Sequence, residues 1–207
     1  MKKIILISLI TIAGISTSFS QSIWTLSMEP ATPLGDMRNF IERSSLRGLS
    51  GSVSWFVKEN VTLGVSIPWT GFYQKDDRAT WHFDGGAVTA TAWKEFYILP
   101  LYVNAKYHFL TEEDSRFLPY AGLSVGAVFI EQSAQVGTYE FKHKNWKAAM
   151  APELGTLIPM GIEKTWGLNV MLRYQMAFYN ENDISLLQFL NYSIGVYWKI
   201  YPHGERY

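Results

Sequence analysis

Carboxylates and imidazoles occur together in two polar segments of the sequence, and these residue types could do chemistry. His82 and Asp84 lie in one segment, and Glu140 and His143 lie in the other. If both segments emerged on one face of the molecule, the four groups could bind zinc, or act as a base and its orienting partner in an acyl transfer. Their spacing matches no known metal or catalytic motif. We therefore interpret them as solvated loop residues and expect no metal and no cofactor.

Alternation of apolar and polar residues predicts the elements that would position such groups. From Val61 to Trp69 every odd residue is apolar and every even one is small or polar, so a strand would show one face to hydrocarbon and one inward. We expect eight strands, at residues 22–32, 46–57, 61–74, 93–109, 117–130, 145–160, 166–179 and 185–201. Long connections at 33–45, 75–92 and 131–144 alternate with short ones at 58–60, 110–116 and 161–165, as in transmembrane barrels.

The start of the chain and its composition limit the class of protein. Residues 1–21 combine two lysines, an apolar run and a small polar end, which predicts a secretory signal peptide and a single domain at 22–207. Without Lys2 and Lys3, 18 basic residues become 16 against 18 acidic ones, and this balance argues against nucleic-acid binding. Zero cysteines exclude disulfides. Eight Trp, 12 Tyr and 12 Phe in an alternating pattern leave a membrane barrel or a soluble sandwich or lipocalin-like barrel.

Hairpin folding tests the pattern, because residues paired across an antiparallel turn point to the same side of the sheet. Folding about Glu59, Glu113 and Glu163 brings apolar residues together in all three hairpins, which predicts an outer apolar face. The expected pairs are Val57–Val61, Trp55–Leu63, Val53–Val65, Leu49–Trp69, Val103–Leu123, Leu101–Val125, Ile158–Leu168, Thr156–Val170, Leu154–Leu172 and Pro152–Tyr174.

The opposite parity predicts a lumen lined by serine, glycine and asparagine, with several charges. Glu153 and Arg173 pair directly when the chain folds about Glu163, so we predict that they touch. Glu29, Lys106 and Lys199 also point inward. Because side chains fill the lumen of an eight-stranded barrel, an isolated charge there needs a partner. We interpret the five residues as a structural charge network; a gated polar plug is the alternative.

Tryptophans fall at both ends of the expected strands. Trp24, Trp55, Trp166 and Trp198 lie near the short turns, whereas Trp69, Trp93 and Trp146 lie near the long connections. Two aromatic girdles are typical of a membrane barrel and favour it over a soluble one.

Two stretches carry a family resemblance. Residues 118–127, Leu-Pro-Tyr-Ala-Gly-Leu-Ser-Val-Gly-Ala, are similar to a Pro-Tyr-x-Gly-x-Gly strand, and Pro152-Glu153-Leu154-Gly155 is followed by Arg173-Tyr174. In these residues the chain resembles the small outer-membrane β-barrel family, porin-like proteins that include OmpX-like, OmpW-like and OmpA transmembrane-domain members, in the form common in Bacteroidetes. The resemblance implies an eight-stranded antiparallel up-and-down transmembrane β-barrel in a Gram-negative cell outer membrane. The end of the chain departs from the family, because residues 202–207 run past the last expected strand, whereas family members stop on the aromatic residue that ends that strand.

The expected function is a structural or interaction role at the cell envelope, by a monomeric barrel without catalysis. The expected partners are outer-membrane lipid and lipopolysaccharide, and an extracellular or envelope protein; Lys142, His143, Lys144 and Lys147 could meet lipopolysaccharide phosphates, or form an ordinary solvated turn. Aromatic residues in or beside the long loops could contact a partner or pack among themselves: Trp81, Phe83, Tyr139 and Phe141.

Two alternatives stay open. A narrow channel for a small solute would need a continuous inner void. A lipid A-modifying barrel enzyme would need a serine with histidine at the rim, as such enzymes of this architecture have. The sequence shows no matching motif, and His108 lies at the short-turn end.

Overall fold

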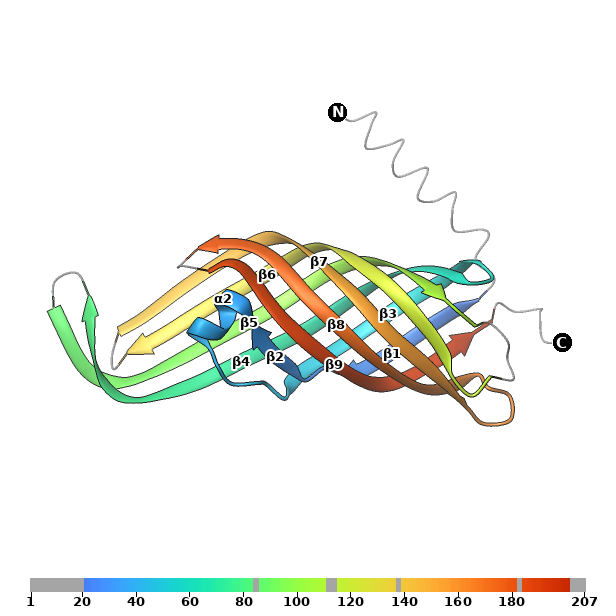
Figure 1. Cartoon of the computed structure of the whole chain (residues 1–207), viewed down its shortest axis with the longest axis horizontal. Helices are drawn as coiled ribbons and strands as arrows, with labels where there is room; N and C mark the ends of the chain where they lie inside the picture. The colour runs from blue at the N-terminus through green and yellow to red at the C-terminus, as the bar shows by residue number, and fades with distance from the viewer. Residues whose placement is uncertain (1–20, 84–85, 111–114, 137–138, 182–183, 202–207) are drawn as a thin grey trace, which may run out of the picture.

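Alternating strands fold this chain into a closed antiparallel β-barrel (Figure 1). The computed structural model describes residues 21–83, 86–110, 115–136, 139–181 and 184–201. Its strands are β1 (Ser22–Met28), β2 (Ala31–Leu34), β3 (Arg47–Lys58), β4 (Val61–Phe83), β5 (Gly86–His108), β6 (Leu118–Val136), β7 (Tyr139–Met160), β8 (Trp166–Glu181) and β9 (Ile184–Ile200). A short helix, α2 (Gly35–Phe40), follows β2. None of the described helices is long and apolar enough to cross a bilayer.

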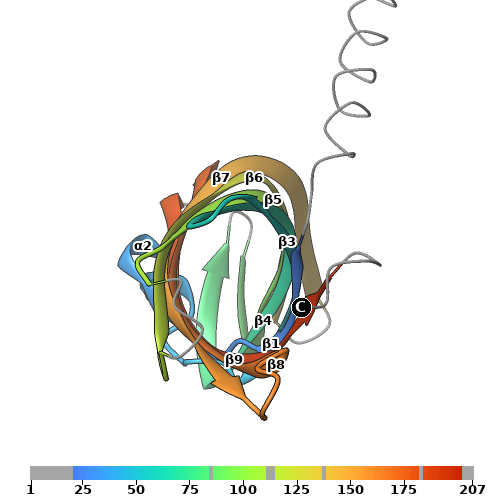
Figure 2. The same cartoon turned by 90° about the vertical axis from the view of Figure 1, so that its right-hand side faces the viewer.

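Pairing of β1 with β9 closes the ring of strands, which Figure 2 shows from one end. β1 also pairs antiparallel with β3, and each strand from β3 to β8 pairs antiparallel with the next one along the chain. We call the end where β1 begins and β9 finishes the terminal end. The opposite end, where β4 to β7 extend farthest, is the hairpin end (Figure 1).

The first expected strand, 22–32, is two strands in one line. Met28 pairs with Ile194 and Ala31 with Asn191, so β1 and β2 keep a single register along β9. On the other side the register changes, because Ala31 exchanges backbone hydrogen bonds with Ser45 in place of a β3 residue. Pro30, which has no N–H, lies at this break. The chain then turns into α2.

The two faces of the barrel wall differ as the alternation predicts. Leu154 is 63% exposed and Val103 60% exposed on the outer face, whereas Ser124 and Asn191 on the inner face are fully buried. Side chains of successive strand residues point to opposite faces, so apolar residues surround the outside of the barrel. A soluble barrel would have the reverse arrangement, and the soluble alternatives are therefore excluded.

The hairpin registers agree with expectation in two of three cases. Trp55–Leu63, Val53–Val65 and Leu49–Trp69 are confirmed in β3–β4, as are Ile158–Leu168, Thr156–Val170 and Leu154–Leu172 in β7–β8. The pair Val57–Val61 is wrong, because the register shifts after Phe56 and Lys58 pairs with Val61.

The expected β5–β6 register is wrong by two residues. Val103 pairs with Val125, and Leu101 pairs with Ala127. A slip of two residues conserves the parity of every side chain, so the outer face is still the apolar one.

Two of the three expected long loops are strand extensions. β4 and β5 stay paired out to Phe83 and Gly86, and β6 and β7 out to Val136 and Tyr139. The ladder between β3 and β4 reaches only to Arg47 and Gly71, so the hairpins project beyond the closed barrel (Figure 1). The expected connections 75–92 and 131–144 are therefore wrong.

The packed core lies inside the barrel and has two parts. Toward the hairpin end it is mainly apolar, built by Ala31, Met37, Ile41, Phe72, Phe96, Ile98, Tyr102, Val128, Ile130, Ala149, Ala151, Ala177, Tyr179, Leu187 and Phe189. Toward the terminal end a smaller cluster contains Ile23, Leu118, Tyr120, Leu157, Met171 and Tyr197. The prediction of a polar lumen is thus correct around the middle of the barrel and wrong toward the hairpin end.

Candidate functional site

A cluster of buried charges lies in the lumen, centred on Arg173 of β8. Arg173 Nη1 is 3.1 Å from Glu29 Oε1, and Arg173 Nη2 is 2.9 Å from Glu153 Oε2. Lys106 Nζ lies 3.1 Å from Glu153 Oε1. Glu29 is fully buried, and Glu153 and Arg173 are each 2% exposed. The predicted contact between Glu153 and Arg173 is confirmed.

The strand register brings the cluster together. Lys106 pairs with Gly122, Gly122 with Glu153, and Glu153 with Arg173, so the three charged residues lie in one row across four strands. Gly122 makes room within this row, because a Cβ atom there would be 3.0 Å from Glu153 Cγ and from the Ala105 carbonyl oxygen. In the sequence, the alternation of apolar and polar residues places all three charged residues on the inward face, and this is the signal that predicts the row.

The four charges of the cluster balance. Two carboxylates, Glu29 and Glu153, face two cations, Lys106 and Arg173. Removing an ion from water costs several kcal/mol, and here each ion recovers part of that cost from an opposite charge at contact distance. Ser124 Oγ adds a long hydrogen bond of 3.5 Å to Glu153. The cluster therefore has the features of a structural network.

Lys199, the fifth expected member, lies on β9 opposite Ile23 and is partly buried. The ion pairs described above do not include it. Its place near the terminal end, several residues along β9 from Asn191, separates it from the Arg173 row.

Hydrogen bonds between side chains of non-neighbouring strands cross the lumen, and the alternation of residues does not predict them. Tyr102 donates to Gln175 at 2.6 Å, Tyr120 to Asn169 at 2.9 Å, and Tyr179 to Gln132 at 2.9 Å. Asn191 Nδ2 donates to Thr70 Oγ1 at 3.3 Å. Inward parity places each of these residues in the lumen, but their partners depend on the shape of the closed barrel.

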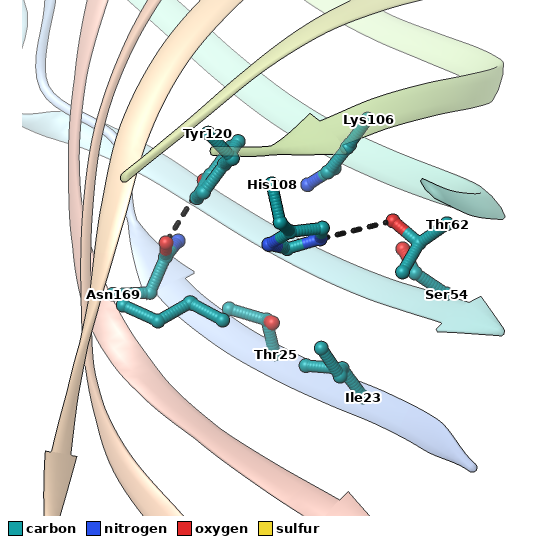
Figure 3. Close-up of a pocket in the computed structure, with 9 residues that line it drawn as sticks. Ile23, Thr25, Ser54, Thr62, Lys106, His108, Tyr120 and Asn169 are labelled. Atoms are coloured by element: carbon teal, nitrogen blue, oxygen red, sulfur yellow. Dashed lines mark hydrogen bonds between the residues drawn. The ribbon is translucent and has the colours of Figure 1, made fainter. Parts of the chain in front are cut away.

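A small cavity lies beside Lys106 of the charge cluster, and Ile23, near the start of β1, also lines it. Its volume is about 10 Å³, enough for roughly one water molecule. Figure 3 shows Lys106 and His108 of β5 at this cavity, with Thr62 beside the imidazole. Thr62 Oγ1 and His108 Nε2 are 3.3 Å apart, and both residues are buried. A hydroxyl and an imidazole are thus in contact, but both groups are buried in the lumen, away from lipid and solvent.

An aromatic plug fills the lumen toward the hairpin end, and the alternation of residues does not predict it either. The ring centroids of Phe72 and Phe189 are 5.4 Å apart, and those of Phe40 and Phe96 are 5.2 Å apart, both edge to face. Met37 of α2 is fully buried against the plug. Helix α2, which lies in the expected long connection 33–45, therefore contributes a buried side chain to the plug.

Hydrogen bonds between side chains and backbone amides hold the segment around α2 in place. Gln74 Oε1 of β4 accepts a hydrogen bond from the Glu42 amide at 2.7 Å, and Asp36 Oδ2 accepts one from the Ser185 amide at 3.2 Å. Lys94, in contact with Asp76 at 2.8 Å, lies 5.2 Å from the Phe40 ring centroid. These contacts connect α2 to β4, β5 and β9.

The predicted girdle tryptophans lie on the outer face at both ends. Trp24 pairs with Trp198, and Trp198 pairs with Trp166, which forms one row of three indoles near the terminal end. Trp55 lies close to this row, opposite Ser22 and Leu63. Trp69, Trp93 and Trp146 lie toward the hairpin end, each beside another aromatic ring: Tyr97, Tyr73 and Phe129.

The predicted loop residues belong to the projecting hairpins. Trp81 and Phe83 are in β4, and Tyr139 and Phe141 in β7, but their side chains lie outside the described part of the structure. The same holds for the side chains of His82, Asp84 and Glu140. Among the described side chains there is no group of three or more potential metal ligands.

The basic stretch does not form a single surface patch, because it lies in strand β7. Side chains alternate along a strand, so Lys142 and Lys144 share one face, and His143 and Lys147 share the other. Lys144 Nζ is 3.1 Å from Glu131, and Lys147 Nζ lies 5.7 Å from the Tyr179 ring centroid.

Comparison with known proteins identifies the fold. No protein-family profile and no curated protein matches the sequence. Solved structures do: Neisserial surface protein A aligns with a TM-score of 0.52 and 13% identity, over 87% of this chain and 96% of that one. The attachment invasion locus protein Ail of Yersinia pestis aligns at 0.49 and 8% identity, over 88% and 99%. The outer membrane protein OprG of Pseudomonas aeruginosa aligns at 0.47 and 12% identity, over 88% and 97%.

The alignment with Neisserial surface protein A, together with the closed ring of antiparallel strands, defines the class of fold. The chain has the fold of the small outer-membrane β-barrels, with eight strand positions around the ring, the first occupied by β1 and β2 together. The apolar outer surface of the barrel fits a location in the outer membrane. The narrower expectation of a Bacteroidetes form stays a prediction.

Proposed function

We propose that this barrel serves the outer membrane as a structural or interaction protein whose lumen is closed. Residues 1–21 would direct export, which places the terminal end in the periplasm and the projecting hairpins outside the cell. Function would then depend on the outer surface and the hairpins, where protein or lipid partners can reach the molecule.

The observation that carries this proposal is the obstruction of the lumen at two levels. Arg173 with its two carboxylates blocks the middle, and the plug around Phe72, Phe96 and Met37 blocks the hairpin end. Cross-lumen hydrogen bonds such as Tyr102–Gln175 bridge strands between these levels. In a barrel of this size, side chains packed in this way fill the lumen along the described strands, which supports a closed lumen.

The conduit alternative has less support. It would require a continuous void, and the cavity beside His108 has room for about one water molecule. The lipid-modifying alternative would require an accessible nucleophile with its base. The Thr62–His108 pair is buried in the lumen. Mass spectrometry of lipid A from cells with and without the gene tests that alternative, and we expect no change.

Fractionation and conductance test the proposal itself. We expect the protein in detergent-extracted outer membrane, folded and resistant to cold SDS. Planar-bilayer recordings of the purified barrel should show no steady conductance. A stable open level would contradict the closed lumen, and recovery only in the soluble periplasmic fraction would contradict the membrane location.

A further inference from the structure

Four side chains on the outer face, toward the hairpin end, form what we call the cation–aromatic patch: Arg47 of β3, Tyr73 and Lys75 of β4, and Trp93 of β5. Arg47 Cζ lies 5.5 Å from the Tyr73 ring centroid, and Lys75 Nζ lies 4.8 Å from the Trp93 ring centroid. The two rings are 5.6 Å apart. Two cations therefore lie against one aromatic pair, in the geometry of cation–π contacts.

The patch lies where the apolar surface ends. Along β4 the outward residues run from Leu63 through Ile67 and Trp69 to Tyr73 and Lys75, from aliphatic to aromatic to charged. In membrane barrels this order marks the passage from hydrocarbon to headgroups. Arg47 pairs with Gly71, four residues before Lys75, so the two cations start about 13 Å apart along the strand.

Within the described part of the chain, neither cation of the patch is paired with a carboxylate. Arg47 and Lys75 form no ion pair with any described residue, although both are exposed. Lys94, Lys106, Lys144 and Arg173, in contrast, each lie within 3.1 Å of a carboxylate. The two exposed positive charges are therefore available to an anion from outside the chain.

Other groups lie around the patch. Glu95 of β5, opposite Tyr73, is an exposed carboxylate and opposes anion binding. Asp77, an exposed carboxylate two residues after Lys75 on β4, also opposes anion binding. Gly71 and Tyr97 lie on the side toward the hydrocarbon-facing surface. A Cβ atom at Gly71 would have its nearest neighbour, a Trp69 ring atom, at 3.4 Å, which is ordinary van der Waals contact.

From this geometry we infer that the patch binds the headgroup of a phosphorylated glycolipid in the outer leaflet, as in lipopolysaccharide. Arg47 and Lys75 would contact phosphate groups, and the Tyr73–Trp93 pair would pack against sugar between them. Two cations separated by an aromatic surface suit a headgroup whose phosphates are separated by sugar; a lipid with one phosphate reaches one cation. The inference rests on the proposed outer-membrane location.

Binding can be measured with the full mature barrel folded into phosphatidylcholine nanodiscs. Purified lipopolysaccharide is titrated, and affinity is read by native mass spectrometry or by the rise in melting midpoint. We expect Arg47→Gln and Lys75→Gln each to weaken binding about fivefold, and the double variant about 25-fold, since one cation near anionic headgroups contributes about a fivefold effect. Glu95→Gln should tighten binding about fivefold.

Lys144→Gln is the matched control, because Lys144 is an exposed lysine on the same face that is already paired with Glu131. Affinity of this control should stay within about twofold of the parent. Equal losses in Lys144→Gln and Lys75→Gln would overturn the assignment of the patch. Equal stabilisation by phosphatidylglycerol would overturn the glycolipid as its ligand. A barrel that fails to enter nanodiscs at all contradicts the membrane location instead, so the two failures are distinguishable.

Discussion

Pro68 of β4 and Pro100 of β5 lie between the pairs Ser66–Tyr102 and Thr70–Ile98, whose register places the two prolines opposite each other on adjacent strands, at a hydrogen-bonding position of the ladder. On the same two strands the His108 amide donates to the Asn60 carbonyl, and hydrogen-bonded pairs recur at every second residue. Neither proline has an N–H, so the ladder is interrupted here and resumes in the same register. Because the two prolines are opposite each other, both missing N–H donors belong to one residue pair of the ladder, and no second pair loses a hydrogen bond.

Pro100→Ala should restore one of these bonds. The amide introduced at position 100 would donate to the Pro68 carbonyl, and we expect it to be protected from hydrogen exchange as strongly as the amides at positions 98 and 102. Hydrogen–deuterium exchange of the barrel in nanodiscs measures this. Exchange at the rate of an unstructured amide would show that the two residues do not occupy a hydrogen-bonded pair.

Arg173→Met should destabilise the barrel strongly. The change leaves Glu29 and Glu153 buried with Lys106 as the remaining cation of the cluster, and breaking a buried ion pair costs about 3–5 kcal/mol. Urea unfolding from vesicles, followed by heat-modifiable gel mobility, gives the free energy of unfolding. Unchanged melting would remove the cluster from the account of stability.

Replacing the whole cluster should be less harmful than breaking it. We expect a variant with Glu29→Gln, Glu153→Gln, Lys106→Met and Arg173→Met to recover most of the loss caused by Arg173→Met, because no buried charge is then left without a partner. The same unfolding measurement applies. If the fourfold variant is less stable than Arg173→Met, the charged side chains stabilise the barrel by more than neutralising one another.

Gly122→Ala and Gly51→Ala form a matched pair of substitutions in the wall. A Cβ atom at Gly122 would press against Glu153 and the Ala105 carbonyl at 3.0 Å, whereas one at Gly51 would meet nothing within 4 Å. We expect Gly122→Ala to lower the free energy of unfolding by about 1–3 kcal/mol and Gly51→Ala to leave it unchanged or higher. Equal effects of the two variants would mean that the row does not depend on space at Gly122.

Met37→Ala tests helix α2 as part of the plug. Met37 is fully buried, and truncating such a side chain costs about 2–5 kcal/mol, whereas Leu46 is 80% exposed and Leu46→Ala should cost less than about 0.5 kcal/mol. Thermal or urea unfolding compares the two. If Met37→Ala does not change the free energy of unfolding, the packing of α2 against the plug does not contribute to stability.

The alternation predicts the barrel and its faces, because lipid and a packed lumen impose opposite demands on successive residues. The same logic fails for the projecting hairpins. Beyond the membrane both faces of a strand meet water, so the sequence around Gln74 and Lys94 loses its alternation and resembles a loop. Register within β5–β6 was missed by two residues, since the pattern fixes parity and not the position of the turn.

The candidate site was predictable in part. Parity places Glu153 and Arg173 in one row, and their contact follows from the hairpin fold. Contacts across the lumen, such as Arg173 with Glu29, depend on how far the strands are staggered when the ring closes. Helix α2 carries no such signal, because six residues between a strand and a loop are too few to show a period.

The pairing of Ser22 with Ile200 has a consequence for the connectivity of the chain. The seam between β1 and β9 is held by the same kind of antiparallel ladder as every other pair of strands, and its two edges meet at the terminal end. A short peptide joining residues 201 and 21, with a cut in one of the turns at the terminal end, would therefore give a circular permutant with the same set of neighbours. The order in which the ribosome delivers the strands is separable from the shape that they finally adopt.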